Sequence, residues 1–174
     1  MNPKTAQDGD GTEGDFASYL TFRLDLLKTE MIQGANVVYR REIGLDVRTL
    51  RVLRAICDAP GSTSTRVIER TLIEKTLLSK VVADLVERKL VRRTIHPDDA
   101  RHYQLWPTAA GKKARKASDK IGKAMEEQML AVLSADEKAA LCRIIDKLVD
   151  DLRNAAQGHK KSGGSAVKAA SAAA

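Results

Sequence analysis

The sequence is poor in aromatic residues and cysteine, and it lacks long apolar runs. Aromatic residues make up 3% of the 174 positions, and Cys57 and Cys142 are the two cysteines. No apolar run approaches the roughly 20 residues of a membrane-spanning helix, and the acidic, glycine-rich start of the chain does not resemble a signal peptide. Two widely separated cysteines indicate neither a disulfide framework nor a zinc cluster. We therefore expect a cytoplasmic protein without a membrane partner, with both thiols reduced and in the core.

The sequence also lacks the short motifs of common enzymes. It contains no glycine-rich phosphate loop, no Gly-x-Ser-x-Gly and no His-Glu-x-x-His. Apart from Asp98-Asp99 in a turn, no pair of carboxylates suggests acid–base chemistry. His96 and His102 flank that turn, but two histidines without a third converging donor do not indicate a metal site. We expect neither catalysis nor a bound cofactor or metal.

Positive charge is concentrated in the middle of the chain. The net charge is +7, and residues 61–120 hold 14 basic against 7 acidic residues. Residues 1–60 hold 8 basic and 9 acidic residues, and residues 121–174 hold 8 and 7. A local excess of this kind indicates contact with a polyanion, although a charge run is also typical of a solvated surface.

Composition divides the chain into a structured region and two tails. Residues 1–14 are rich in glycine and polar residues, and residues 158–174 in glycine, serine, alanine and lysine. Such segments bury little apolar surface, so we expect a disordered N-terminal tail and a low-complexity C-terminal tail. Residues 15–157 should form a single domain.

Apolar spacing predicts helices in most of this region. The first covers 16–41 and ends at Gly44, and the second begins after an Asp46 cap. A short third helix follows residues 62–64 and runs to about residue 70. The fourth, within 73–90, should be polar on its outer face, with four residues buried: Leu78, Val81, Val82 and Leu85.

A β-hairpin and two long helices follow. The β-prone runs 91–95 and 103–106 flank a charged turn, which predicts a hairpin. Thr108 opens the next helix, and Ser134 with Glu137 forms a capping box before an apolar stripe. This order predicts a mainly α fold with a small β-hairpin wing. Residues 45–107 would be a winged helix-turn-helix core, and 15–41 and 108–157 the helices outside it.

The wing resembles that of the MarR family of winged helix-turn-helix transcriptional regulators. The likeness extends over about 16–155. The family signature Asp-x-Arg is present as Asp99-Ala100-Arg101, and Thr108-Ala109-Ala110-Gly111 follows in the expected order. Ser79-Lys80 and Leu90-Val91 agree with the family upstream. Three positions depart from the family pattern: Asp84, Lys89 and Pro107.

The resemblance implies sequence-specific binding of duplex DNA. The fourth helix would enter the major groove, where Lys75, Thr76, Ser79 and Lys80 would contact bases or phosphates. Arg101 would enter the minor groove at the wing tip, oriented by Asp99. Surface exposure without DNA contact is the alternative for each. The predicted DNA-binding residues are Ser62, Ser64, Arg66, Lys75, Thr76, Ser79, Lys80, Arg92, Arg93, Asp99 and Arg101.

The first helix carries four of the six aromatic residues, which indicates a buried destination for them. The resemblance implies that the first and last helices of two subunits interlock into a homodimer, which would bind a pseudo-palindromic operator. It also implies a pocket for a small anionic or aromatic effector that releases the repressor. Core packing is the alternative, as is redox control through Cys57. The candidate ligand residues are Tyr19, Phe22, Tyr39, Arg40 and Arg41.

Two other functions remain open at this point. One is an architectural DNA-binding protein without an effector, and the other is a helical protein–protein interaction module. A requirement for a palindromic site would separate a dimeric regulator from an architectural binder, which recognises DNA shape.

Overall fold

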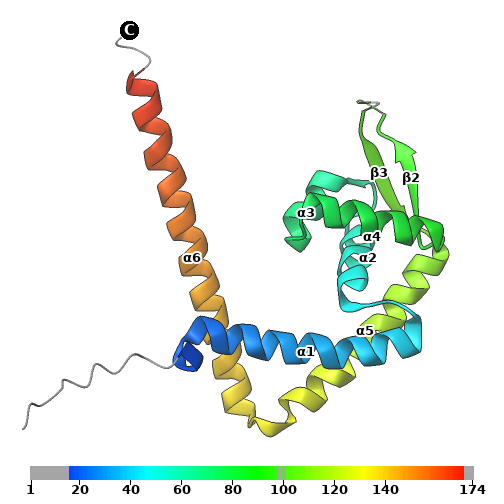
Figure 1. Ribbon diagram of the computed structural model, residues 1–174, viewed down its shortest axis with the longest axis horizontal. Coiled ribbons are helices and arrows are strands. Elements are labelled where there is room, and N and C mark those ends of the chain that lie inside the picture. The colour runs from blue at the N-terminus through cyan, green and yellow to red at the C-terminus, as the bar shows by residue number, and fades with distance from the viewer. Residues whose placement is uncertain (1–15, 98, 100, 171–174) are drawn as a thin grey trace, which may run out of the picture. The chain divides into compact units, whose positions relative to one another are not determined.

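The computed structural model describes residues 16–97, 99 and 101–170, and side chains to residue 155 (Figure 1). The predicted tail 1–14 lies outside these residues. The fold is mainly helical with a small antiparallel sheet, which confirms the predicted class. The elements are η1 (Phe16–Ser18), α1 (Leu20–Ile43), α2 (Val47–Asp58), β1 (Ser62–Thr63), α3 (Ser64–Thr71), α4 (Lys75–Glu87), β2 (Val91–Ile95), β3 (Tyr103–Pro107), α5 (Ala109–Met129), η2 (Leu130–Val132) and α6 (Ala135–Ala170).

The chain divides into two compact units, and the boundary along the sequence falls within α5. The first ends at Lys123 and the second begins at Ala124. Helix α6 continues to Ala170, so its backbone covers part of the segment in which the composition predicts a low-complexity tail. None of the helices in the described part of the chain combines the length and apolar character of a membrane span.

The core of the first unit lies between α2, α3, α4 and the sheet. Leu50, Leu53 and Ile56 of α2 are fully buried, as are Leu78 and Leu85 of α4. The buried face of α4 is the one that the apolar spacing predicts. The Asp46 cap is confirmed, because its carboxylate accepts a hydrogen bond of 2.7 Å from the Thr49 amide. Local capping and burial of one face therefore fix these helices.

The sheet has three strands in the order β1-β3-β2, so the expectation of a two-stranded hairpin was incomplete. Val91–Ile95 pairs with Tyr103–Pro107 as predicted. The additional strand β1 pairs Ser62 with Leu105. Gly61 leads into it with a φ of 81° and donates its amide to the Leu105 carbonyl at 2.9 Å. The base of the wing is thereby joined to the turn before α3.

The end of α4 and the start of α5 meet at the carbonyl of Leu90. This carbonyl accepts a hydrogen bond from the Thr108 amide at 3.0 Å, and the Thr108 hydroxyl donates to the neighbouring Lys89 carbonyl at 2.7 Å. The same hydroxyl oxygen accepts from the Gly111 amide at 3.0 Å and so caps α5. A Cβ on Gly111 would lie 2.1 Å from the Leu90 oxygen. The Thr-x-x-Gly motif thus caps a helix and leaves room for another backbone.

Helix α6 carries an apolar stripe that the chain leaves in solvent. Its capping box is confirmed, since the Glu137 carboxylate accepts from the Ser134 amide at 2.8 Å. The Ser134 hydroxyl accepts from the Glu137 amide at 3.3 Å. Cys142 is exposed, so its assignment to a core was wrong for the single chain, and Cys57 is half-buried. The exposed stripe consists of Leu141, Ile144, Ile145, Leu148, Val149 and Leu152.

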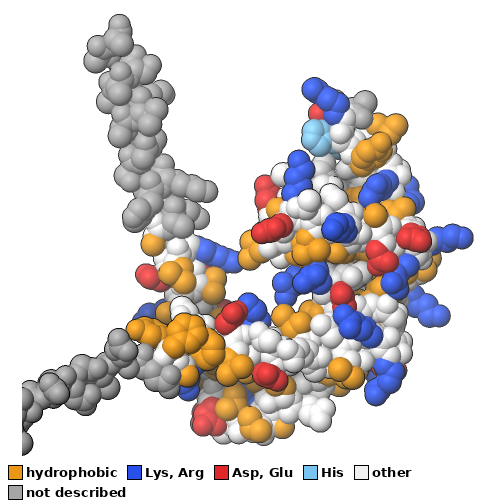
Figure 2. Space-filling view, in the orientation of Figure 1, with side chains coloured by type: hydrophobic (Ala, Val, Ile, Leu, Met, Phe, Trp, Pro, Cys, Tyr) orange, Lys and Arg blue, Asp and Glu red, His pale blue; other side chains and the backbone are white. Residues whose placement is uncertain are grey.

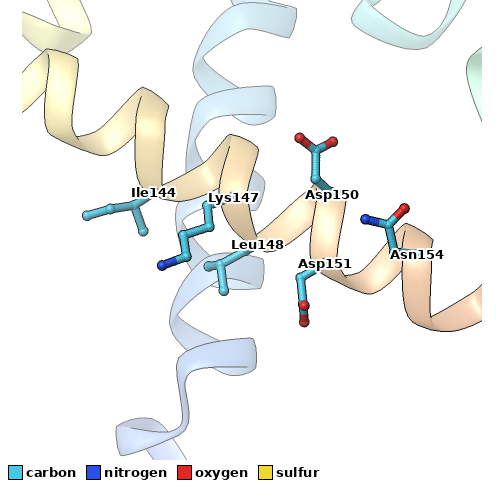
Figure 3. A pocket seen from close by; sticks show the side chains of 6 residues that line it. All are labelled: Ile144, Lys147, Leu148, Asp150, Asp151 and Asn154. Atoms are coloured by element: carbon cyan, nitrogen blue, oxygen red, sulfur yellow. The ribbon is translucent and has the colours of Figure 1, made fainter.

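Alongside this stripe the surface of α6 is hollowed (Figure 3). The cavity has a volume of about 630 Å³. Every lining residue comes from α6, so the cavity is open space between side chains of one helix rather than an enclosed pocket. Its lining residues are Ile144, Lys147, Leu148, Asp150, Asp151 and Asn154.

Two non-glycine residues with positive φ flank α4. Leu72 precedes it with a φ of 56°, and Lys89 follows it with a φ of 57°. The Lys89 amide donates to the Val86 carbonyl and the Leu90 amide to the Leu85 carbonyl, each at 2.9 Å, which ends the helix. A left-handed conformation is unfavourable for an L-residue with a Cβ atom. The backbone of Lys89 is therefore strained.

We predict that Lys89→Gly stabilises the protein. Removing the strain should raise the free energy of unfolding by about 0.5–1 kcal/mol, after allowance for the greater flexibility of glycine in the unfolded chain. Urea denaturation measures this change. Lys113→Gly, inside exposed α5, is the control and should lower the same free energy by about 1 kcal/mol. A destabilised Lys89→Gly would contradict the assignment of strain.

Candidate nucleic-acid interface

Helix α4 presents a polar face to solvent at its start. Lys75, Thr76, Ser79 and Lys80 are all exposed, as predicted. The Ser79 hydroxyl donates to the Lys75 carbonyl at 3.0 Å and keeps its oxygen available to accept. These side chains offer two cations and two hydroxyl groups within the first two turns, a donor set suited to base edges and phosphates in a major groove.

The opposite end of α4 is tied to the turn between α1 and α2. Arg88 donates to the Asp84 carboxylate at 2.7 Å and to the Gly44 carbonyl at 2.9 Å. Asp84 thus has a cationic partner four residues later, which offsets the negative charge that it places on this helix. Asp84 departs from the family pattern, and its ion pair with Arg88 was not predicted from the sequence.

The start of α3 carries two of the predicted residues at the surface and one inside. Ser64 and Arg66 are exposed. Ser62 is buried, and its hydroxyl donates to the Ala59 carbonyl at 2.6 Å. Its prediction as a DNA contact was therefore wrong: the side chain stabilises the turn before β1. Thr63, the residue that caps α3, lies between them.

At the wing tip the Asp99 carboxylate contacts three nitrogen atoms of Arg101 and His102. Asp99 accepts from the Arg101 amide at 3.0 Å and from the Arg101 guanidinium at 3.4 Å. Its second oxygen lies 3.0 Å from Nδ1 of His102. These hydrogen bonds, the Arg101 amide above all, hold the pKa of the Asp99 carboxyl below its ordinary value. The predicted pairing of Asp99 with Arg101 is present, while the Arg101 side chain remains 91% exposed.

The two arginines of β2 lie on opposite faces of the wing, because successive residues of a strand alternate. Both are exposed. The guanidinium of Arg92 lies over the Trp106 ring, 5.4 Å from its centre. The indole N–H of Trp106 donates to the Thr94 hydroxyl at 3.0 Å. Arg92 is therefore partly engaged by the outer face of the sheet, and Arg93 belongs to the face that carries Leu105.

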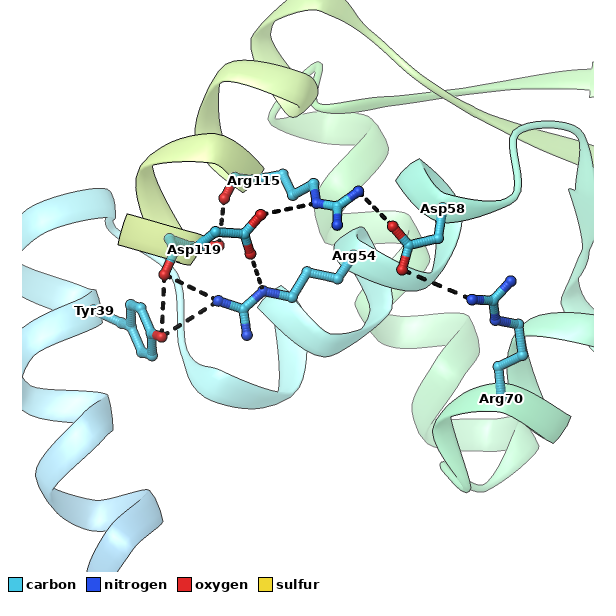
Figure 4. A network of polar contacts seen from close by, with 7 residues as sticks. Tyr39, Arg54, Asp58, Arg70, Arg115 and Asp119 are labelled. Carbon is cyan, nitrogen blue, oxygen red and sulfur yellow. Dashed lines mark hydrogen bonds and ion pairs between the residues drawn. The ribbon is translucent and has the colours of Figure 1, made fainter. Parts of the chain in front are cut away.

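A network of ion pairs holds the helices behind this interface (Figure 4). Asp119 of α5 pairs with Arg54 of α2 and with Arg115, each at 3.0 Å. Arg115 also pairs with Asp58 at the end of α2, and Arg70 of α3 lies 3.7 Å from the same carboxylate. The network therefore connects α2, α3 and α5.

Tyr39 extends this network to α1. Its hydroxyl donates to the Ser118 carbonyl at 3.3 Å, and the Arg54 guanidinium donates to the same carbonyl at 3.0 Å. A Cβ on Gly122 would lie 2.5 Å from the Tyr39 oxygen. The network was not predicted from the sequence. Its one local signal was the spacing of Arg115 and Asp119, which are four residues apart on α5.

The five candidate ligand residues do not converge within one chain. Tyr19 and Tyr39 are separated by 20 residues of helix, or about 30 Å at 1.5 Å per residue. Tyr39 is buried against α5, whereas Arg40 and Arg41 are exposed beside Asp46 and Glu42. At the other end of α1, the Phe22 ring lies 4.7 Å from that of Phe16. One small molecule cannot contact both ends of α1 within a subunit, so the predicted effector pocket needs residues from another helix or a second subunit.

Cys57 lacks the surroundings of a reactive thiol. Burial raises the pKa of the Cys57 thiol, which favours the protonated and less reactive form. Among the described residues, no group of three or more His, Cys, Asp or Glu side chains is arranged to hold a metal ion.

Comparison with known proteins gives the following likenesses in sequence. A profile of the MarR family matches residues 43–102. The transcriptional regulator HosA of Escherichia coli O111:H- is 34% identical over 99 residues, which cover 57% of this chain and 73% of that protein. HosA of Escherichia coli O157:H7 has the same identity and coverage.

Solved structures of low identity share the fold. The PcaV transcriptional regulator from Streptomyces coelicolor, solved with its natural ligand, has 23% identity and a TM-score of 0.67. The likeness covers 79% of this chain and 96% of PcaV. MepR of S. aureus, solved in complex with DNA, has 18% identity and a TM-score of 0.68, over 76% of this chain and 98% of MepR.

Proposed function

Because this chain belongs to the MarR family of transcriptional regulators, we propose that it binds a pseudo-palindromic operator as a homodimer and represses transcription. The observation that carries the proposal is one compact unit that holds both an exposed basic helix face, at the start of α4, and a projecting wing with an exposed Arg101. An α-helix fits the major groove of duplex DNA, and an arginine suits the negative potential of a narrow minor groove.

The contacts divide by their role. Lys75, Thr76, Ser79 and Lys80 would read bases or contact phosphates in the major groove. Arg101 would enter the minor groove, with Asp99 holding its backbone and guanidinium in place. The remaining candidates would contact phosphates, which position the protein without specifying sequence: Ser64, Arg66, Arg92 and Arg93.

The exposed apolar stripe of α6 supports a second copy of the chain as its partner. Burying these side chains removes apolar surface from water, at roughly 25 cal/mol per Å². The apolar residues along the first half of α1 are also exposed, among them Leu20, Leu24 and Leu27. A two-fold dimer would present two α4 helices to half-sites about one helical turn of DNA apart.

A small anionic or aromatic effector would release the repressor. PcaV was solved with its natural ligand, which supports a ligand-responsive fold without identifying the ligand of this chain. The separation of the two ends of α1 restricts the contacts within a subunit to one group, either Tyr19 with Phe22 or Arg40 with Arg41. An effector acts only through a difference in affinity between the DNA-competent and incompetent geometries.

Selection of binding sites from random duplex DNA tests the proposal. We expect an inverted repeat with half-sites about one helical turn apart. With the selected site, Arg101→Ala should weaken binding and reduce the slope of log K against log salt concentration by about 0.9 for each subunit. Lys113→Ala, on exposed α5, is the control and should leave both unchanged. Equal affinity of Arg101→Ala and the parent would refute the role of the wing, and sites without symmetry would favour an architectural binder.

Dimerisation is tested by mass in solution. Analytical ultracentrifugation at micromolar concentration should give twice the mass of one chain. Ile145→Asp with Leu148→Asp places charge in the apolar stripe, costs several kcal/mol of association, and should yield monomers. Ala139→Asp is the control, because it adds a carboxylate to the opposite side of α6. A monomeric parent would end the dimer proposal.

Control by an effector carries a thermodynamic requirement. If an aromatic carboxylate such as benzoate lowers operator affinity 100-fold, the operator must lower the affinity for benzoate 100-fold, a coupling of about 2.7 kcal/mol. Isothermal titration of benzoate into free and DNA-bound protein measures both affinities. A compound that dissociates the complex yet binds both forms equally would contradict this mechanism.

A further inference from the structure

The inner face of the wing is apolar along its length, and it runs from the hydrophobic core out into solvent. Val91 and Leu105 on this face are 2% and 1% exposed. Side chains two residues apart share a face of a strand, and paired residues share it across the ladder. Ile95 and Tyr103, which pair with each other at the outer end of the ladder, are thus on this face. They are 64% and 54% exposed.

On the outer face, by contrast, the aromatic residue is covered by other groups of the chain. Trp106 donates to Thr94, lies beneath the guanidinium of Arg92 and packs over Gly61, whose Cβ would be 3.0 Å from the indole ring. The chain therefore covers the ring of the outer face with its own groups. On the inner face it leaves an aromatic and an aliphatic side chain mostly in water, beyond the reach of the core.

Positive charge brackets this apolar pair. Arg93 is exposed on the same face, one step closer to the core, and Arg101 lies in the turn beyond the pair. Neither strand contains an acidic residue. The Asp99 carboxylate is engaged by Arg101 and His102. Figure 2 shows basic and hydrophobic side chains together at the projecting end of the wing.

This alternation fits the backbone of duplex DNA. Phosphates along a strand are separated by deoxyribose rings, whose faces are less polar and line the minor groove. Arg93 would contact a phosphate, and the apolar pair would contact the deoxyribose wall. Arg101 would contact the groove floor or the next phosphate. Proteins that enter minor grooves use both arginine and apolar side chains there. An apolar partner protein would leave the two arginines without a matching charge.

We infer that Ile95 and Tyr103 contact the deoxyribose wall of the minor groove and set how far the wing enters it. This inference rests on the proposed DNA-binding function. It assigns the two residues an apolar contribution to affinity, separate from the cationic contribution of Arg101. The two contributions respond differently to salt, because an apolar contact releases no counterions.

Threonine substitutions isolate this contribution. Ile95→Thr and Tyr103→Thr keep a residue favourable in strands while removing most of the apolar surface. Each substitution should weaken binding to the selected operator about fivefold, and the double variant about 20-fold. The reason is that each variant loses roughly half of the apolar side-chain surface that the parent would bury against DNA. The salt slope should equal that of the parent. Tyr103→Phe should bind like the parent, since it keeps the ring.

The control lies on the outer face of the same ladder. Gln104→Thr introduces the same residue one position along β3, on the face away from the apolar pair, and should leave affinity unchanged. The variants' melting temperatures and masses are measured alongside.

The outcomes separate the two proposals. A parent that binds no duplex DNA contradicts the proposed function itself. A parent that binds, with a double variant within twofold of it, overturns the role of Ile95 and Tyr103. A smaller salt slope or a lower melting temperature in the double variant would show that the pair only supports the hairpin and Arg101. A change in mass would show that the pair contacts a second copy of the chain, and this too would overturn the inference.

Discussion

The arrangement of the first unit depends on the close approach of α5 to the carbonyl of Leu90. That oxygen ends the connection from α4 and accepts from Thr108 at the start of α5. The two strands of the hairpin leave and return at this same point, since β2 begins at Val91 and β3 ends at Pro107. The absence of a side chain at Gly111 makes the approach possible. Helix α4, the wing and helix α5 thus share one backbone junction.

The ion-pair network secures the other side of α5. Asp58 and Asp119 each face two guanidinium groups, so the charges are shared between helices instead of paired in isolation. Exposed ion pairs contribute little individually, and a partly buried network with fixed geometry contributes more. Its members come from α2, α3 and α5, and Tyr39 adds α1. A movement of α5 would therefore be transmitted to α3, which precedes α4.

Local signals explain which features could be predicted. The Asp46 cap, the Ser134–Glu137 capping box and the buried faces of α2 and α4 depend on residues within a few positions of each other. Strand β1 was missed because two residues have no periodicity and their partner lies in another part of the chain. Ser62 was misassigned because its hydroxyl is suited to DNA, while its burial follows from that strand. The candidate ligand residues lie at both ends of α1, which was not anticipated because composition does not measure distance along a helix.

The pairing of β1 with β3 has a consequence for how this unit folds. Ser62 meets Leu105, so the strands close a loop of about 40 residues, and both α3 and α4 lie inside it. Closing such a loop costs entropy before its contacts offset it, and contacts between distant residues slow folding. The helices of the helix-turn-helix can form early through local interactions. Their native orientation nevertheless requires the pairing of β1 with β3. Helix α4 and the wing, which would both contact DNA, therefore reach their native arrangement in one cooperative step.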